Sequence, residues 1–157
     1  MALSLCVALT PACATSRMGD ADLRLQAGQP CFTLTPKESE RAPSVRLQAV
    51  MVTDASSTPV SKVWSVLLDS STLPTLSPAT CVSYGFAPEG AKSVPVKAPE
   101  LQSGRVYQVH LNTRSSDSSD PTRGYSARFC LLPDASGGRR LVPVVYDTPA
   151  WRTGSCE

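Results

Sequence analysis

The sequence predicts an all-β fold in which short strands pack as a sandwich. Apolar and polar residues alternate with a period of two in several short segments, which is the pattern of half-buried strands. Turn signals separate these segments, and 14 prolines favour short strands joined by turns over helices. No segment keeps a 3.6-residue apolar period over three helical turns, so no long amphipathic helix is expected.

Eight strands follow from this pattern, separated by turn signals such as Gly137-Gly138. We expect them at residues 22–27, 31–35, 45–53, 63–69, 81–86, 105–112, 125–132 and 141–146. The segment 45–53 is the clearest, and its second half is apolar on both faces, which predicts a central strand. Trp64 shares an apolar face with Val66, so we expect it in the core.

The segment 101–109 resembles the tyrosine corner of immunoglobulin-like and fibronectin type III domains. In that corner a tyrosine hydroxyl, here that of Tyr107, bonds to the backbone at the start of a strand. Tyr107 is therefore expected to be structural. The predicted fold is an immunoglobulin/fibronectin-III-like β-sandwich with two disulfides.

The composition suits one folded domain. Of 157 residues, 41% are apolar and 18% are charged, which is too apolar for a disordered chain. The net charge of +2 is spread along the chain and Arg139-Arg140 is the one basic doublet, so we expect no nucleic-acid partner. We expect residues 1–12 to be a signal peptide, 13–20 a short tether and 21–157 a single sandwich domain.

The N-terminus indicates export. Residues 2–10 are an uncharged apolar run, too short to span a bilayer. Residues 9–13 resemble a lipobox, at which Cys13 would be acylated, while residues 12–14 also satisfy an A-x-A signal-peptidase site, so both routes stay open. Ala14 after the acylated cysteine favours the outer membrane. We therefore expect a periplasmic protein anchored by lipid to the inner face of that membrane.

The remaining cysteines agree with export. Cys6 would leave with the signal peptide and Cys13 would carry the lipid, which leaves an even number in the folded part. These four are Cys31, Cys81, Cys130 and Cys156. Two disulfides are expected, and the residues alone leave three connectivities open. Because clustered C-x-x-C pairs and nearby histidines are lacking, no metal site is predicted.

Catalysis is not predicted. Hydrolases of the Ser-His-Asp or Cys-His kind need a histidine beside the nucleophile. The one histidine, His110, alternates with Gln108 and Asn112 on the polar face of a predicted strand. The G-x-S-x-G, H-E-x-x-H, P-loop and G-x-G-x-x-G motifs are absent from the sequence. We expect no enzyme activity, no cofactor and no small-molecule substrate.

Residues 113–124 form a polar connection between two predicted strands, longer than most hairpin loops. Long polar loops on rigid sheets often carry recognition, and a solvated loop without a partner is the other interpretation. Asp117 and Asp120 lack the glycine and terminal glutamate of an EF-hand, so no calcium site is predicted.

Four short motifs follow one another along the chain. They are Cys31-Phe32-Thr33-Leu34, the TCVSYG segment at 80–85, the segment 101–109, and the GYSARFC segment at 124–130. Taken in this order, together with the export signal, they resemble periplasmic lipoproteins regarded as type VI secretion immunity proteins. The resemblance spans roughly residues 19–132.

The resemblance implies a protein that binds and neutralises a toxin delivered into the periplasm by neighbouring cells. It would act by occlusion, without chemistry, and its partner would be the cognate toxin protein. The resemblance also implies a Cys31–Cys81 bridge, after which Cys130–Cys156 follows. Charged residues of the 113–124 loop are the candidate contacts, because charged rims speed encounter and set specificity. They are Arg114, Asp117, Asp120 and Arg123.

A structural or carbohydrate-binding module of the cell envelope is the alternative function. It predicts an aromatic platform exposed on one face of the molecule. Most aromatic residues fall on apolar strand faces or beside cysteines, but Tyr84, Tyr146 and Trp151 have no predicted place.

Overall fold

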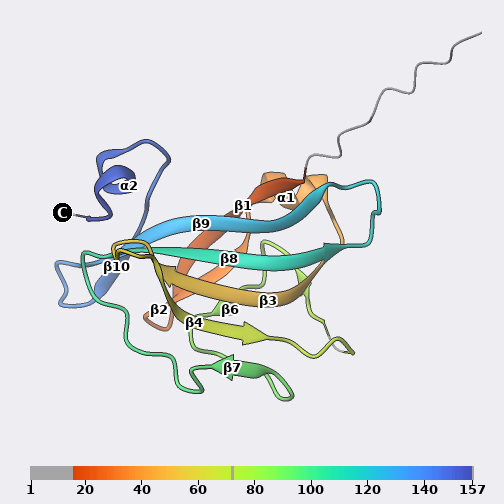
Figure 1. Cartoon of the computed structure of the whole chain (residues 1–157), viewed down its shortest axis with the longest axis horizontal. Coiled ribbons are helices and arrows are strands. Elements are labelled where there is room, and N and C mark those ends of the chain that lie inside the picture. Colours follow the sequence, from red (N-terminus) through yellow and green to blue (C-terminus); the bar gives the residue numbers. More distant parts are fainter. Residues whose placement is uncertain (1–15, 72, 157) are drawn as a thin grey trace, which may run out of the picture.

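A computed structural model describes residues 16–71 and 73–156 as a mostly β protein built on one curled, mixed sheet (Figure 1). The strands are β1 (Arg17–Gln26), β2 (Gln29–Leu34), β3 (Val45–Asp54), β4 (Ser61–Leu67), β5 (Thr75–Leu76), β6 (Val82–Ser83), β7 (Lys92–Val94), β8 (Val106–Ser115), β9 (Thr122–Pro133) and β10 (Arg139–Pro143). The described residues also include the short helices α1 (Pro36–Arg41) and α2 (Pro149–Thr153). The prediction of a mostly β protein is confirmed.

The strands follow the order β6-β2-β1-β9-β8-β3-β4-β7, with β10 beside β9 and β5 beside β3. β1 pairs antiparallel with β2 and parallel with β9, so it joins strands that a sandwich would keep in separate sheets. The result is a curled half-barrel instead of two clear layers. The curl brings Tyr84, just after β6, against Trp64 of β4, with ring centroids 5.3 Å apart.

The core lies inside this curl, with β3 and β8 at its centre. Val50, Val52 and Trp64 are fully buried, so the prediction for Trp64 is confirmed. β3 has β8 on one side and β4 with β5 on the other, which confirms the central position predicted for it. The Tyr107 hydroxyl accepts a hydrogen bond from the Gln102 N–H at 2.8 Å, which is the predicted corner.

Several boundaries differ from the prediction. Residues 17–20, expected in the tether, form the first part of β1 and pair with β9. Gly19 permits this pairing, because a Cβ there would lie 2.5 Å from the Tyr125 ring. The predicted strand 81–86 is reduced to β6, since the chain turns at Gly85, whose φ is +78°.

The helices were not expected from the sequence pattern. Each begins with a threonine N-cap followed by proline, Thr35-Pro36 for α1 and Thr148-Pro149 for α2. Both are too short for an apolar period to be visible, so these capping signals are the only local indication of them.

The structure contains the disulfides Cys31–Cys81 and Cys130–Cys156, which is the pairing that the resemblance implies. The first joins β2 to the residue before β6, and the second joins β9 to the tail after α2. The predicted signal peptide, residues 1–12, and the predicted lipidation site, Cys13, lie outside the described residues. Within residues 16–71 and 73–156, no helix has the length and apolar character needed to cross a bilayer.

Candidate binding cleft beside the C-terminal segment

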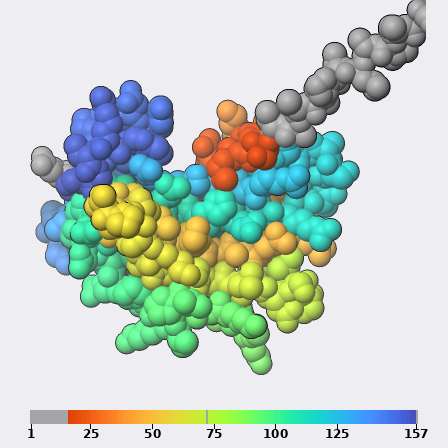
Figure 2. Space-filling view, viewed as in Figure 1, coloured from red at the N-terminus to blue at the C-terminus, as the bar shows by residue number. Residues whose placement is uncertain are grey.

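A cleft opens where two strands share one edge of β9. β1 pairs with β9 as far as Ser126, and β10 pairs with it from Phe129 to Pro133. Between these points β1 diverges, so residues 127–128 help to line a cleft of about 410 Å³. Figure 2 shows this hollow between β1 (red) and the C-terminal segment, residues 143–156 (blue).

The two walls of the cleft differ in chemistry. The β1 wall carries the carboxylates of Asp20 and Asp22, and the opposite wall carries Val145, Tyr146 and Trp151. Val145 is 65% exposed and Tyr146 is 76% exposed. Exposed apolar side chains gathered at a concave site mark a binding surface more often than scattered ones do.

Tyr146, Trp151 and Arg128 form a corner at the rim of the cleft. The rings of Tyr146 and Trp151 meet edge to face, with centroids 5.2 Å apart and planes at 67°. The Arg128 guanidinium stacks on Trp151, 3.6 Å from the ring centroid, and its Nε donates to the Gln108 side-chain oxygen at 2.9 Å. Burial lowers the pKa of Arg128, and these two contacts offset part of its desolvation.

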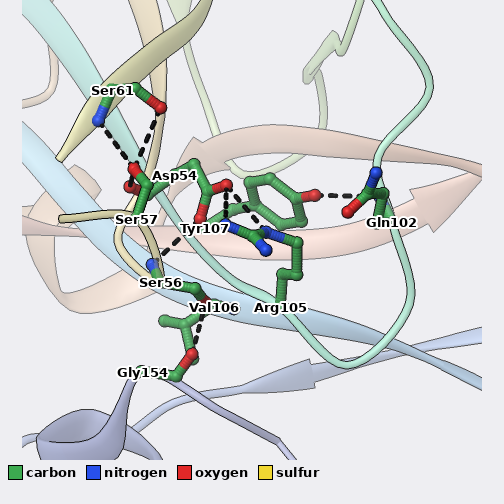
Figure 3. A network of polar contacts seen from close by, with 9 residues as sticks. All are labelled: Asp54, Ser56, Ser57, Ser61, Gln102, Arg105, Val106, Tyr107 and Gly154. Carbon is green, nitrogen blue, oxygen red and sulfur yellow. Dashed lines mark hydrogen bonds and ion pairs between the residues drawn. The ribbon is translucent and has the colours of Figure 1, made fainter. Parts of the chain in front are cut away.

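The C-terminal segment is held to the sheet by polar and covalent anchors (Figure 3). The Ser56 hydroxyl donates to the Gly154 carbonyl and accepts from the Val106 N–H, at 2.8 Å for the latter bond. The Cys156 N–H donates to the Gly104 carbonyl at 2.9 Å, and its sulfur is bonded to Cys130. These anchors fix the aromatic wall of the cleft.

Asp54 supports the Ser56 anchor. One of its carboxylate oxygens accepts from the Ser56 N–H at 2.9 Å, and the other lies 2.6 Å from a guanidinium nitrogen of Arg105 (Figure 3). The hydrogen bond to Asp54 raises the pKa of Arg105. Gly154 ends α2 with a φ of +68°, and a Cβ there would lie 3.2 Å from the Ala55 carbonyl oxygen. The docking of this segment therefore needs a glycine.

The predicted recognition loop is shorter than expected. β8 continues to Ser115 and β9 begins at Thr122, so the connection is residues 116–121 and not 113–124. The polar residues on either side of it belong to the strands, because Arg114 still pairs with β3 and Thr122 with β1. The prediction assigned the end of β8 and the start of β9 to the loop because both are polar.

The two aspartates of this loop bond to its own backbone. A carboxylate oxygen of Asp117 accepts from the N–H and the hydroxyl of Ser119, at 2.8 and 2.6 Å, which lowers the pKa of Asp117. Asp120 accepts from the Thr122 N–H at 2.9 Å, and its other oxygen is buried without a hydrogen-bond partner. Both side chains hold the turn in one conformation.

All four predicted contact residues line one groove of about 600 Å³ at the loop end of β8 and β9. Arg114 and Arg123 are exposed, and Arg114 lies opposite Arg46 of β3 in the strand register. We call this end, formed by Arg46, Arg114 and Arg123, the basic rim. The structure thus brings the predicted residues together, with Arg114, Asp117 and Arg123 exposed and Asp120 partly buried.

An ion pair fixes the base of the loop. The Arg17 guanidinium bonds to the Glu38 carboxylate and, at 3.2 Å, to the Thr122 hydroxyl. The Glu38 side chain is 1% exposed, and its hydrogen bond with Arg17 lowers its pKa. The Arg17 N–H also donates to the Pro121 carbonyl at 3.0 Å.

His110 lies on the outer face of β8 with Gln108 and Asn112, and it packs against Gly124 of β9. Burial lowers the pKa of His110, and no hydrogen bond to its imidazole occurs in the described part of the chain. Among residues 16–71 and 73–156, no three His, Cys, Asp or Glu side chains are grouped to hold a metal ion.

The sequence pattern did not indicate the cleft. Its walls come from residues 20–23 and 143–151, which are far apart in the chain. The sequence offered two signals, the large aromatic residues Tyr146 and Trp151, for which no place was predicted. Both lie in the C-terminal segment, which the Cys130–Cys156 disulfide joins to β9. No protein-family model matches this chain, and neither the curated proteins nor the solved structures contain a match.

Proposed function

We propose that this protein is a periplasmic lipoprotein that binds and neutralises a toxin of type VI secretion by occlusion, and that the cleft is its main contact surface. The observation that carries the proposal is the corner of Tyr146, Trp151 and Arg128. Trp, Tyr and Arg are the residue types that dominate binding energy at protein interfaces. Here they stand together at the rim of a cleft, with Tyr146 76% exposed.

Rigidity supports occlusion as the mechanism. An inhibitor that is already ordered loses little conformational entropy when it binds, so more of its contact energy appears as affinity. The cleft wall is tied to β9 by Cys130–Cys156 and to the turn after β3 by the Ser56 bond. Two disulfides also favour an oxidising compartment, in agreement with the periplasm. The proposed anchor to the inner face of the outer membrane is lipid on Cys13.

The scaffold proposed for this role is a variant of the immunoglobulin/fibronectin-III-like sandwich. The tyrosine corner at Tyr107 supports that relation. The parallel pairing of β1 with β9 departs from it, because it makes one continuous curled sheet where a sandwich has two.

The basic rim is a second contact surface in this proposal. Arg114 and Arg123 are exposed, while Asp117 and Asp120 shape the loop that presents them. Charges at the edge of an interface mainly raise the association rate. The rim would therefore steer the toxin, and the cleft would hold it.

The test is a protection assay with the products of neighbouring genes. Cells that direct such a product to the periplasm should survive when this chain is co-expressed, and the purified proteins should form a one-to-one complex. Tyr146→Ala should weaken the complex at least about tenfold, as expected for an interface hot spot. Val60→Ala is the matched control, since Val60 is also exposed, at 59%, and does not line the cleft. Lack of protection and of complex formation with every neighbouring product would refute the proposal.

A carbohydrate-binding envelope module is the second candidate, and one observation favours it. The aromatic residues without a predicted place, Tyr146 and Trp151, meet at an exposed cleft that also offers the polar side chains of Gln108 and Ser126. Retention on peptidoglycan or glycan beads that Tyr146→Ala abolishes would support this module. Retention that the substitution leaves unchanged would exclude this cleft as the glycan site.

A further inference from the structure

The charge of the cleft differs from that of the whole chain. Three charged side chains line it, namely Asp20, Asp22 and Arg128, which gives a formal balance of two negative charges against one positive. The full chain carries a net charge of +2. The cleft is therefore a local acidic site on a weakly basic protein.

Arg128 is already engaged within the protein. Its guanidinium stacks on Trp151, and its Nε donates to Gln108 at 2.9 Å. An arginine held in this way forms part of the wall, and it does not swing toward the opposite carboxylates without losing both contacts.

Within the described residues, neither of the carboxylates that β1 contributes to the cleft, Asp20 and Asp22, forms an ion pair. The two arginines of β1 bond elsewhere, Arg17 to Glu38 and Arg24 to the carbonyls of residues 78 and 79. Asp20 attracts Arg17 without forming an ion pair with it. The Asp22 carboxylate accepts one hydrogen bond, from the Leu23 N–H at 2.9 Å, and both carboxylates can still attract a cation from outside the protein.

The aromatic wall suits a cation better than the apolar face of a sugar ring. One face of Trp151 is covered by Arg128, and the edge-to-face contact with Tyr146 leaves the two rings at 67° instead of coplanar. The exposed Tyr146 ring can receive a cationic group or its alkyl stem. A pair of carboxylates opposite an open aromatic ring is complementary to one long basic side chain.

We propose that the cleft receives a single arginine or lysine side chain of the protein partner, held between Asp20 and Asp22 on one wall and Tyr146 on the other. This inference rests on the proposed function, since it names the chemistry of the partner at the same site. The occupant is a residue on the surface of the toxin, and the cleft sets specificity by requiring its positive charge.

The experiment uses the isolated protein and a blocked tripeptide, acetyl-Gly-Arg-Gly-amide, followed by amide NMR. The arginine peptide should shift the backbone signals of Asp20, Ser126 and Tyr146, with a dissociation constant on the order of 1 mM. The citrulline peptide has nearly the same shape without the charge, and it should leave those signals in place. A trimer of N-acetylglucosamine serves as the glycan probe.

Two charge-matched variants complete the test. Asp20→Asn combined with Asp22→Asn should weaken arginine-peptide binding at least about tenfold. Glu40→Gln combined with Glu89→Gln removes the same charge from exposed sites outside the cleft and should leave binding unchanged.

Three results would overturn the inference. They are no arginine-peptide binding up to about 20 mM, equal binding of the citrulline peptide, or stronger shifts with the glycan trimer. Each result is independent of the protection assay, because no toxin is present. If the protein protects cells but does not bind the arginine peptide, the proposed function stands and this inference is wrong. A protein that binds the peptide but protects against nothing retains the site and loses the function.

Discussion

The loop between β8 and β9 and the C-terminal segment, at opposite ends of β9, differ in how they use their polar groups (Figure 1). In the loop, Asp117 and Asp120 bond to the turn that contains them. In the C-terminal segment, backbone groups and one sulfur bond to distant residues, with Gly154 bound by Ser56 and Cys156 by Gly104. The interior of the loop is thus held by its own residues, and within the described chain its long-range backbone bonds lie only at its two ends, Ser116 and Pro121. The C-terminal segment is instead held mainly by bonds to the sheet and to the turn after β3.

This difference explains why the two regions suit different roles. The loop presents Arg114 and Arg123 to solvent, where salt screens their charge and each contributes mainly to steering. The C-terminal segment presents Tyr146 and Trp151 on a wall fixed by long-range bonds, which is the arrangement of an anchor site. The comparison predicts large, non-local effects of changes in the C-terminal segment and small, local effects of changes in the loop.

The largest expected effect follows from removing the Cys130–Cys156 bridge. Because its cysteines are 26 residues apart, Cys130→Ala with Cys156→Ala should lower the free energy of unfolding by about 3.5 kcal/mol in the chain-entropy account. Urea unfolding measures this loss, and hydrogen exchange should show residues 143–156 opening while the 116–121 loop stays unchanged. Equal opening of both regions would contradict the comparison.

The next effect tests the base of the loop. Glu38 is buried beside Arg17, so Glu38→Gln should cost about 3 kcal/mol at pH 7, at the lower end of the range for broken buried pairs because Arg17 reaches solvent. The native pKa of Glu38 lies below its ordinary value of 4.5. The stability from this pair is therefore complete above about pH 4.5 and is lost as the pH falls through the native pKa.

The measurement is urea unfolding of both proteins as a function of pH. The difference between the wild type and Glu38→Gln should shrink below pH 4.5. Glu40→Gln, an exposed position on the same helix, is the control and should not alter the profile. A difference that stays constant down to low pH would show that the Glu38 charge is not what stabilises this end.

The sequence predicted the parts of the fold that local pattern determines. The long strands β3, β8 and β9 alternate clearly, and Tyr107 lies in a recognisable corner. β5 and β7 were not predicted, because a strand of two or three residues is too short to show an alternation of apolar and polar residues. Their pairing depends on the neighbouring strands β3 and β4. The continuous sheet was not predicted either, because the parallel pairing of β1 with β9 joins residues more than 100 positions apart.

The site was harder to predict for the same reason. Asp20 falls in the predicted tether and Asp22 begins a predicted strand, while Tyr146 ends the last predicted strand and Trp151 lies in a tail with little regular pattern. Only the tertiary fold places them across one cleft. The loop was predicted as a recognition site because it is long, polar and charged. Part of that length belongs to the ends of β8 and β9, and Asp117 bonds to the loop itself.

A smaller effect tests how the C-terminal segment docks. Gly154→Ala places a Cβ at a φ of +68° and 3.2 Å from the Ala55 carbonyl oxygen, so it should cost about 1.5 kcal/mol. Trp151 fluorescence should report a looser segment before global unfolding in urea. Gly137→Ala has a comparable φ of +83° with open space around it, so it is the matched control for backbone strain alone. Identical behaviour of the two variants would mean that the close approach at Gly154 adds nothing to docking.

The smallest effect concerns the basic rim and has the opposite sign. Arg114 lies directly across from Arg46 in the register of β8 and β3, and like charges at that position repel. Arg114→Gln keeps most of the side chain and removes the charge, so it should raise the free energy of unfolding by roughly 0.3 kcal/mol at low salt. The gain should vanish near 1 M salt, where screening is nearly complete. Arg123→Gln shares the rim without facing Arg46 in the register and should show no such gain. Loss of stability in Arg114→Gln would show that the rim arginines hold the loop as the C-terminal anchors hold their segment, and the distinction between the two regions would fail.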